Sequence, residues 1–536
     1  MKTYDYIIVG AGSAGCVLAE RLSRSGKHSV LLLEAGEKQR TPWISLPVGY
    51  GKTFYDGAVN WKFETQPDHA LDNRTGYWPR GKVVGGSGAI NALVYARGLP
   101  NDFDDWAASG ARGWGWNTVR AVYQDLETQV DPDGTTRGTG AIHVQNVSDQ
   151  IHPVNHHYFD GVGELGLPTT DDMNGDTPEG AAIYRINTKN GRRMHSARAF
   201  LKPALKRANV TLVTGAMVER VVLQDRCATG IVANVRGQSQ TFHAGRDVIL
   251  SAGSVTSPRI LQLSGIGPAG HLKSHGVTPV MDAPHVGGNL QDHLAVSYYF
   301  KATEPTLNNV LAPWWGKVMA GMQYALNRRG PLSLSVNQCG GYFKSDPSLD
   351  VPDQQLYFNP LTYTTTPDGK RTVIKPDPFA GFILSFQPAR PTSRGRIDIS
   401  SHDPMAAPLI QPNSLSTDTD IEQIVAGGRL CQRLAATRAI TGLIKSAMDP
   451  DLRTMDDAGL VADFRKRCGT VYHPIGTCKM GDDPTTSVID PNLRVHGIDG
   501  LRVVDASVFP NITSANTNAP TMMVAYRAAD LILAGG

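Results

Sequence analysis

The sequence has few cysteines, and none of them are spaced as metal ligands usually are. Six cysteines are scattered along 536 residues without a C-x-x-C pair, which argues against a zinc site and against a disulfide framework. We therefore expect buried free thiols and no metal. The six are Cys16, Cys227, Cys339, Cys431, Cys468 and Cys478.

The sequence also lacks long apolar runs and an excess of one charge. No run approaches the roughly 18 apolar residues of a membrane helix, so we expect no membrane span. A net charge of +3 gives no basic surface for nucleic acid or for an anionic membrane. The first motif begins at residue 5, which leaves no room for a cleaved signal peptide, so the expected location is the cytoplasm.

What the sequence does contain is, first, the pattern of a nucleotide-binding βαβ unit. An apolar run over residues 7–9 predicts a buried strand that leads directly into Gly10, Gly12 and Gly15. In this fingerprint the first glycine allows a tight turn, the second lets the backbone approach a pyrophosphate, and the third lets the helix pack close to the strand. The N–H groups at the start of that helix favour the negative charge of phosphates.

An acid closes this unit. Glu34 stands nineteen residues after Gly15, directly after a second apolar run over 29–33. A carboxylate at that position accepts hydrogen bonds from the ribose hydroxyls of an adenosine and disfavours a 2′-phosphate. Strand, glycines, helix, strand and acid in this order are more specific than the glycines alone, which also occur in purely structural turns.

A second glycine cluster covers residues 81–91 and includes Gly81, Gly86 and Asn91. The segment is apolar enough to be buried, yet too rich in glycine to be held by its own side chains. Backbone of this kind either wraps a flat ligand or forms a tight loop against a neighbouring helix. The cluster by itself is compatible with both interpretations.

The C-terminal segment brings together a histidine, an acid and the start of a helix. His473 lies in a loop bounded by glycine and proline, and Asp505 ends a buried strand predicted within 501–507. Residues 516–521 open a closing helix whose positive end favours the charge of a reduced ring system. Asp505 can bond a polyol chain. A lone histidine is more often structural, but His473 stands beside this predicted redox ligand.

Three other stretches bear on the fold. Residues 210–224 and 230–235 alternate apolar and polar, which predicts a meander rather than another βαβ crossover. Residues 247–253 predict a buried strand that returns to the nucleotide-binding domain. Asp292 and His293 follow a glycine turn, where they either tie the turn to the body of the protein or belong to the site.

These stretches resemble the glucose–methanol–choline (GMC) family of FAD-dependent oxidoreductases over nearly the whole chain. The first signature of that family is similar to residues 81–91 with Tyr95 and Gly98, and the second is similar to residues 253–267. The resemblance implies that His473 is the catalytic histidine. It also implies that Asn518 faces this histidine across the substrate, with Asn516 as the alternative.

The resemblance further implies how FAD is held. Some relatives attach FAD covalently through a histidine in the first signature, where this chain has Ile90, so non-covalent FAD is implied. The implied FAD contacts are Gly10, Gly12, Gly15, Glu34, Ala35, Gly81, Val84, Gly86, Asn91, Val94, Val218, Asp505, Ala506, Asn516 and Thr517.

The chain is too long for a single core, so two domains are expected. The predicted fold class is α/β, with a discontinuous Rossmann-type FAD-binding domain and an α+β substrate domain built on an antiparallel sheet. The FAD-binding domain is predicted over 1–150, 201–293 and 470–536, the last part carrying the catalytic histidine. The substrate domain is predicted over an excursion at 151–200 and over 294–469.

The implied reaction is the oxidation of a small primary alcohol or polyol to an aldehyde, or to a ketone, with hydride transfer to flavin N5. His473 would remove the hydroxyl proton, because imidazole titrates near neutrality. Asn518 would stabilise developing alkoxide character, and oxygen or another acceptor would reoxidise the flavin.

Two alternatives belong to other functional classes. An FAD-containing hydroxynitrile lyase of the same family is disfavoured by an asparagine opposite the histidine. An NAD-linked dehydrogenase would leave the second glycine cluster and Asp505 without a ligand.

Overall fold

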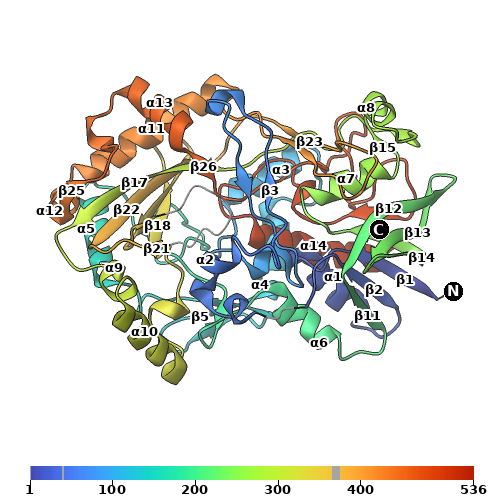
Figure 1. The fold of residues 1–536 in the computed structure, drawn as a ribbon, viewed down its shortest axis with the longest axis horizontal. Helices are drawn as coiled ribbons and strands as arrows, with labels where there is room; N and C mark the ends of the chain where they lie inside the picture. Colours follow the sequence, from blue (N-terminus) through green and yellow to red (C-terminus); the bar gives the residue numbers. More distant parts are fainter. Residues whose placement is uncertain (1, 39–40, 365–374, 536) are drawn as a thin grey trace.

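The computed structural model describes residues 2–38, 41–364 and 375–535, and two large β-sheets lie at opposite ends of its long axis (Figure 1). Both chain termini lie beside the first sheet, at the right of the view. In the described ranges, no helix is long and apolar enough to cross a membrane.

The first sheet has seven strands and is parallel at its centre. Its order is β11-β2-β1-β14-β13-β12, and β27 pairs with β14. Ile7 pairs with Leu31 on one side and with Val248 on the other, both in parallel register. The strands are β1 (Thr3–Val9), β2 (Val30–Glu34), β11 (Val210–Thr214), β12 (Ala216–Gln224), β13 (Cys227–Val235), β14 (Gln238–Leu250) and β27 (Leu501–Val503).

The central strands of this sheet are apolar along their length because helices bury them. Every residue of β2 is buried, as expected for a parallel strand covered on both faces. Helix α1 (Ser13–Ser23) packs against the C-terminal helix α14 (Asn518–Leu533), and α7 (Thr256–Leu263) packs against β12. The first and last segments of the chain therefore share one core.

The predicted meander is correct for only part of its range. Strands β12, β13 and β14 are antiparallel neighbours, but residues 210–214 form β11, which pairs with β2 in parallel. The prediction of a meander over all of 210–224 was therefore wrong at its start. Gly215, with φ +64°, separates the two strands, so the apolar alternation continues across a change of direction.

The second sheet has six strands and is antiparallel. Its order is β18-β19-β22-β17-β25, and β26 pairs with β17. Its strands are β17 (Leu294–Ala302), β18 (Cys339–Phe343), β19 (Gln354–Asn359), β22 (Gly381–Pro388), β25 (Ile444–Ala447) and β26 (Gly469–Thr470). Rings stack across neighbouring strands, with 5.1 Å between the centroids of Phe300 and Phe382 and 5.3 Å between those of Phe358 and Phe382.

Helices cover this second sheet. Helix α11 (Asp418–Ala435) packs on β22, and α13 (Asp457–Arg467) packs on both α11 and β17. From the predicted excursion, α5 (His156–Glu164) packs on α12 (Arg438–Leu443). Two packed layers of this kind are the predicted α+β arrangement. The exact division of the chain into domains stays a prediction.

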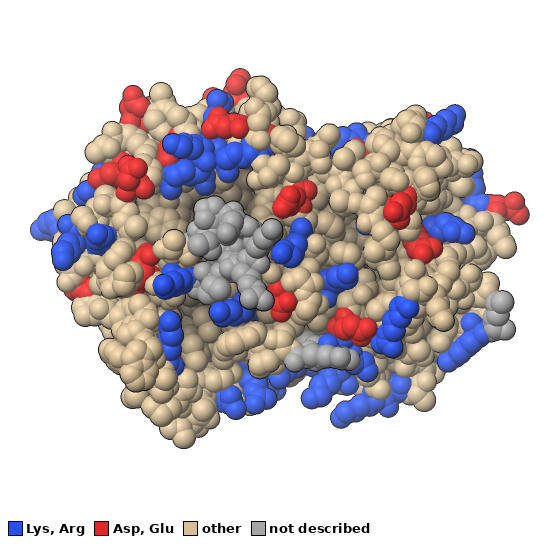
Figure 2. All heavy atoms as spheres, viewed as in Figure 1, with Lys and Arg blue, Asp and Glu red and all other residues tan. Residues whose placement is uncertain are grey.

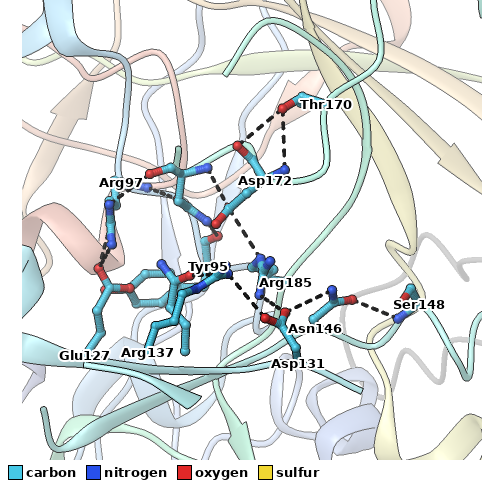
Figure 3. Close-up of polar contacts among 12 residues, drawn as sticks. Tyr95, Arg97, Glu127, Asp131, Arg137, Asn146, Ser148, Thr170, Asp172 and Arg185 are labelled. Carbon is cyan, nitrogen blue, oxygen red and sulfur yellow. Dashed lines mark hydrogen bonds and ion pairs between the residues drawn. The ribbon is translucent and has the colours of Figure 1, made fainter. Parts of the chain in front are cut away.

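A polar network fixes the stretch that follows the second glycine cluster (Figure 3). Arg97 donates to Glu127 at 2.6 Å, and Tyr95 N donates to Arg185 O at 2.9 Å. The Arg185 side chain lies between Asp131 at 3.0 Å and Asp172 at 3.3 Å. These buried and half-buried ion pairs join three segments that are distant in the sequence, so the glycine cluster is anchored at its C-terminal end.

The irregular stretch after β2 runs between the two sheets in the view of Figure 1. It contains the short helix α2 (Tyr50–Thr53) and the two-residue strands β3 (Phe63–Glu64) and β4 (Tyr77–Trp78). The Tyr55 and Tyr77 rings stack with centroids 5.6 Å apart. Aromatic packing and backbone hydrogen bonds, such as that from Trp61 N to Arg80 O at 2.8 Å, together hold this segment in place.

Candidate active site

A single cavity of about 930 Å³ extends from the glycine motif at the end of β1 to the loop that carries His473. Its walls come from both sheets and from the irregular stretch after β2. The predicted site residues on its wall are Gly10, Gly12, Glu34, Ala35, Gly81, Gly86, Asn91, Val94, Val218, His473, Asp505, Ala506, Asn516, Thr517 and Asn518. Two predicted contacts, Gly15 and Val84, are not on this wall.

The two glycine-rich stretches touch each other. A Cβ atom added to Gly86, which has φ +54°, would lie 2.7 Å from the Gly12 Cα. A Cβ atom added to Gly15 would lie 1.9 Å from the Gly10 carbonyl oxygen, so Gly15 serves the close packing of α1 on β1 rather than the cavity. Larger side chains at these positions would separate the elements that form this end of the cavity.

Glu34 lies at the carboxyl end of β2, beside the turn after β1. Its carboxylate accepts from the Ala11 N–H at 2.9 Å and from the Gly36 N–H at 2.8 Å. Burial raises the pKa of this carboxyl to about 7, and these two backbone donors act against that rise. The group is thus a buried acceptor at the place where the fingerprint predicts a ribose.

Asp505 lies two residues after β27, on the opposite side of the β1 turn. One carboxylate oxygen accepts from Gly253 N at 2.8 Å and from Ser257 Oγ at 2.6 Å, and the other accepts from Ser507 N at 2.8 Å. Asp505 therefore ties the start of α7 to the C-terminal segment while also lining the cavity. Burial raises its pKa above the usual range.

The loop that carries His473 is held by Asp292 from the glycine turn. The Asp292 carboxylate accepts from His473 N at 2.7 Å, from His293 N at 3.0 Å and from the Thr470 hydroxyl. Burial raises the pKa of Asp292 to about 6 against these donors. The sequence predicts that the glycine turn either ties itself to the body of the protein or belongs to the site. The contacts of Asp292 favour the second interpretation, because this residue positions the histidine loop.

The residue before His473 has an uncommon backbone conformation. Tyr472 has φ +71°, which costs a non-glycine residue about 1–3 kcal/mol. Arg80 Nη2 donates to the Tyr472 carbonyl at 2.6 Å, and Tyr472 N donates to Thr470 Oγ1 at 2.8 Å. These bonds maintain a strained conformation that directs His473 into the cavity.

Hydrogen bonds determine which nitrogen of His473 carries a proton. The Ala389 carbonyl can only accept, so His293 Nε2, 2.8 Å away, donates to it. Neutral His293 then has no proton on Nδ1, which accepts from His473 Nδ1 at 3.0 Å. His473 Nε2 is left without a proton, and this is the nitrogen that faces the cavity-lining Asn516.

The electrostatic environment keeps both histidines neutral. Burial lowers the pKa of His293 to about 4. Burial also places the pKa of His473 well below its ordinary value, with further lowering from His293 and from the Arg80 guanidinium. At neutral pH His473 therefore presents an unprotonated nitrogen to the cavity.

The structure brings Asn516, rather than Asn518, to the histidine. Asn516 Nδ2 lies 3.0 Å from His473 Nε2, and Asn516 Oδ1 is buried with no partner among the described residues. Asn518 instead accepts from Ser13 Oγ at 2.6 Å, near Gly88 and the start of α1. Helix α14 begins at Asn518, and the side-chain amides of Asn516 and Asn518 point to different partners. The spacing of the two residues in the sequence does not reveal this.

The far end of the cavity has an aromatic and cationic wall. Its members include Tyr50, Tyr55, Tyr363, Leu311, Arg80 and Lys317. The only carboxylates on the described part of the wall are Glu34 and Asp505, both at the other end. The aromatic content of residues 50–55 was visible in the sequence, but nothing in the sequence pointed to Leu311 or Lys317.

A cavity with two meeting glycine stretches at one end and an unprotonated imidazole at the other suits a dinucleotide-dependent oxidoreductase. The family models for GMC oxidoreductase match residues 4–295 with the N-terminal region and residues 391–525 with the C-terminal region. The chain belongs to the GMC oxidoreductase family, so the predicted family and fold class are confirmed.

Curated relatives cover the full length of the chain. An alcohol dehydrogenase (acceptor) from Pseudomonas putida is 40% identical over 99% of this chain and 96% of its own length. An oxygen-dependent choline dehydrogenase from Vibrio vulnificus is 39% identical over 99% of this chain and 94% of its own length.

Solved structures agree in fold. Pyridoxine 4-oxidase from Mesorbium loti has a TM-score of 0.87 at 29% identity, covering 98% of this chain and 99% of its own. A formate oxidase has a TM-score of 0.91 at 26% identity, covering 100% of this chain and 98% of its own.

FAD is the cofactor of this family, which confirms that prediction. The described residues also fit it. The cavity is continuous from Glu34, past the meeting point of Gly12 and Gly86, to His473. No acid stands in the first turn of α1, which leaves its N-terminal N–H groups free to favour phosphate.

Proposed function

We propose that this protein oxidises a small, uncharged primary alcohol or polyol to the aldehyde, or a secondary alcohol to the ketone. The observation that carries this proposal is the 3.0 Å contact of His473 Nε2 with Asn516 Nδ2 on the wall of the cofactor cavity. In the structure the amide N–H donates to the lone pair of Nε2. A substrate hydroxyl bound beside the pair would donate its proton to that lone pair and accept from the amide, which suits a hydroxyl group that must lose its proton.

In this proposal His473 is the general base. Its Nδ1 carries a proton, which is donated to His293, so Nε2 holds the lone pair that takes the hydroxyl proton. Asn516 orients the hydroxyl oxygen and stabilises the negative charge that develops on it. Bound FAD supplies the two-electron acceptor for the carbinol hydride. Asn518, which the resemblance favoured, is proposed instead to support the cofactor side through Ser13.

The proposed cofactor contacts are those that face the cavity. Glu34 is proposed to meet the adenosine ribose and Asp505 the polyol chain of FAD. The remaining proposed contacts are Gly10, Gly12, Ala35, Gly81, Gly86, Asn91, Val94, Val218, Ala506 and Thr517. Gly15 and Val84 are proposed to act from behind this wall.

The charge distribution supports an uncharged substrate. Arg80 and Lys317 lie on the wall beyond His473, and no carboxylate lies there among the described residues. Arg80 has an acid near it, Asp292, but Lys317 has none on the cavity wall among the described residues, so a quaternary ammonium alcohol such as choline would meet an unfavourable charge there. The aromatic and apolar part of that wall suits the carbon chain of the alcohol.

The proposal predicts which compounds reduce the bound flavin. Under anaerobic conditions, an uncharged primary alcohol or a polyol should bleach the visible flavin absorption, whereas choline should do so much more slowly. Stopped-flow absorbance over a panel of alcohols measures this, and repeating the assay with oxygen and with an artificial acceptor identifies the oxidant. Cleavage of a cyanohydrin without bleaching would decide for the lyase instead.

We also propose, from the identity of residue 90, that FAD is bound without a covalent link. Because Ile90 stands where some relatives have a histidine linked to FAD, the cofactor should be non-covalent. Acid precipitation should therefore leave the yellow colour in the supernatant, measured by its absorbance. Colour that remains with the precipitated chain would contradict this assignment.

The depressed pKa of His473 predicts a pH profile. The base acts when unprotonated, so a lowered pKa moves the loss of activity to lower pH. The rate of flavin reduction by an uncharged alcohol should be flat from pH 7 to 8 and should fall only below about 6.5. Asp292, with a pKa of about 6, bonds the same loop, so Asp292→Asn tests whether part of the fall belongs to it. A midpoint at or above pH 7 would contradict the neutral assignment.

A further inference from the structure

Helix α10 (Trp314–Asn327) exposes an unusual amount of apolar surface. Twelve large apolar side chains are exposed in the described part of the chain, and six of them belong to this one helix. Trp314 is 76% exposed and Leu326 is 86% exposed. The six, called here the α10 apolar face, are Trp314, Trp315, Val318, Met319, Met322 and Leu326.

The α10 apolar face is one continuous stripe. At 3.6 residues per turn, its six members fall within an arc of about 140°. The opposite side of the helix packs through its only buried residues, Gly316 and Ala320, and a Cβ atom on Gly316 would lie 2.1 Å from the Val310 carbonyl oxygen. The helix therefore turns its small residues to the protein and its large apolar residues to solvent, the reverse of a helix that serves the core.

The charged residues on this helix and directly after it are positive. Helix α10 contains one charged residue, Lys317, and no acid, and Arg328 and Arg329 follow it directly. The end of the helix contacts the hairpin of β9 (Thr188–Lys189) and β10 (Arg192–Arg193), where Tyr324 Oη donates to Gly191 O at 3.0 Å. Arg329 pairs with Asp149 at 2.5 Å. Figure 2 shows this corner, at the lower left, as an uncharged area with cations near its edge.

We propose that the α10 apolar face docks on the surface of an anionic lipid bilayer. Tryptophans, apolar residues on one side and flanking lysine and arginine are the features of a helix that lies in the membrane interface. A second copy fits less well, because a two-fold contact through this face would bring the cations of one copy close to those of the other. The net charge of +3 does not argue against lipid binding, because it describes the whole chain, whereas docking depends on the charges near α10.

This docking would place the substrate cavity at the bilayer. Lys317 is exposed and also lines the cavity. Leu311 before the helix and Leu332 after it line the same cavity. A bilayer under α10 would therefore lie next to the wall of the substrate end, where a compound dissolved in the lipid could enter. Surface docking needs no membrane-spanning segment.

Vesicle binding by the purified, FAD-loaded protein tests the proposal. The wild type should sediment with vesicles that contain phosphatidylglycerol, bind less to pure phosphatidylcholine, and be released as salt is raised. Its tryptophan fluorescence should shift to shorter wavelength on binding. Trp314→Ser with Trp315→Ser should weaken partitioning by about tenfold for each tryptophan removed. Leu326→Ser, a second variant at the most exposed position, should weaken it in the same direction.

Met405→Ser is the matched control, because Met405 is 67% exposed on a loop outside the α10 apolar face. This variant should bind vesicles as the wild type does. Wild-type protein that stays in the supernatant with both kinds of vesicle would overturn the proposal. So would a stable dimer that the double tryptophan variant converts to a monomer, since a second copy would then be the occupant of this face.

Discussion

Replacing His473 by alanine should slow reduction of the bound flavin by about 10² to 10⁴, which corresponds to roughly 3 to 5 kcal/mol of barrier. In the proposed reaction the imidazole takes the hydroxyl proton, and its Nε2 is unprotonated at neutral pH. Stopped-flow measurement of flavin reduction at saturating alcohol isolates this step from reoxidation.

FAD should stay bound in the His473→Ala variant, because Glu34 and the meeting glycines lie at the other end of the cavity. His402→Ala is the matched control, since His402 is exposed on the loop after β23 (Arg396–Asp398). Loss of FAD or of the fold in His473→Ala, with normal reduction in any folded fraction, would show that the histidine is structural. The visible spectrum and thermal unfolding separate these results.

Replacing Asn516 by alanine should slow flavin reduction by about 10² to 10³, because it removes one hydrogen bond to developing negative charge. Asn516 Nδ2 is the donor nearest to the base, 3.0 Å from His473 Nε2. The Kd for the alcohol should change less than the rate, since the bond strengthens as charge develops. The same stopped-flow assay measures both quantities.

Asn518→Ala distinguishes the two asparagines. Asn518 bonds Ser13 rather than His473, so its loss should leave the reduction rate within about tenfold of the wild type while weakening FAD retention. A larger loss from Asn518 than from Asn516 would restore the assignment implied by the family resemblance. Because His473 and Asn516 act on one hydroxyl, the double variant should lose less than the sum of the single losses.

The sequence predicted the parts of the fold that rest on local pattern. The strand that ends at Val9, the helix after Gly12 and the acid at Glu34 occur as expected, because burial on both faces leaves a continuous apolar run and a close approach demands glycine. The strand at 210–214 escaped the same reasoning. Its alternation is that of a meander strand, and its partner β2 lies far away in the sequence.

The site divides in the same way. Sequence alone located the glycine edge and the acid proposed to meet the ribose, since each depends on a short motif, and the family resemblance singled out His473 as a candidate base. Only the tertiary structure decided that His293 fixes the proton on His473, that Asp292 holds its loop, and that Asn516 rather than Asn518 faces it. These contacts cross up to 181 residues of chain, and a hydrogen bond depends on side-chain direction within a few tenths of an ångström, which residue order does not encode locally.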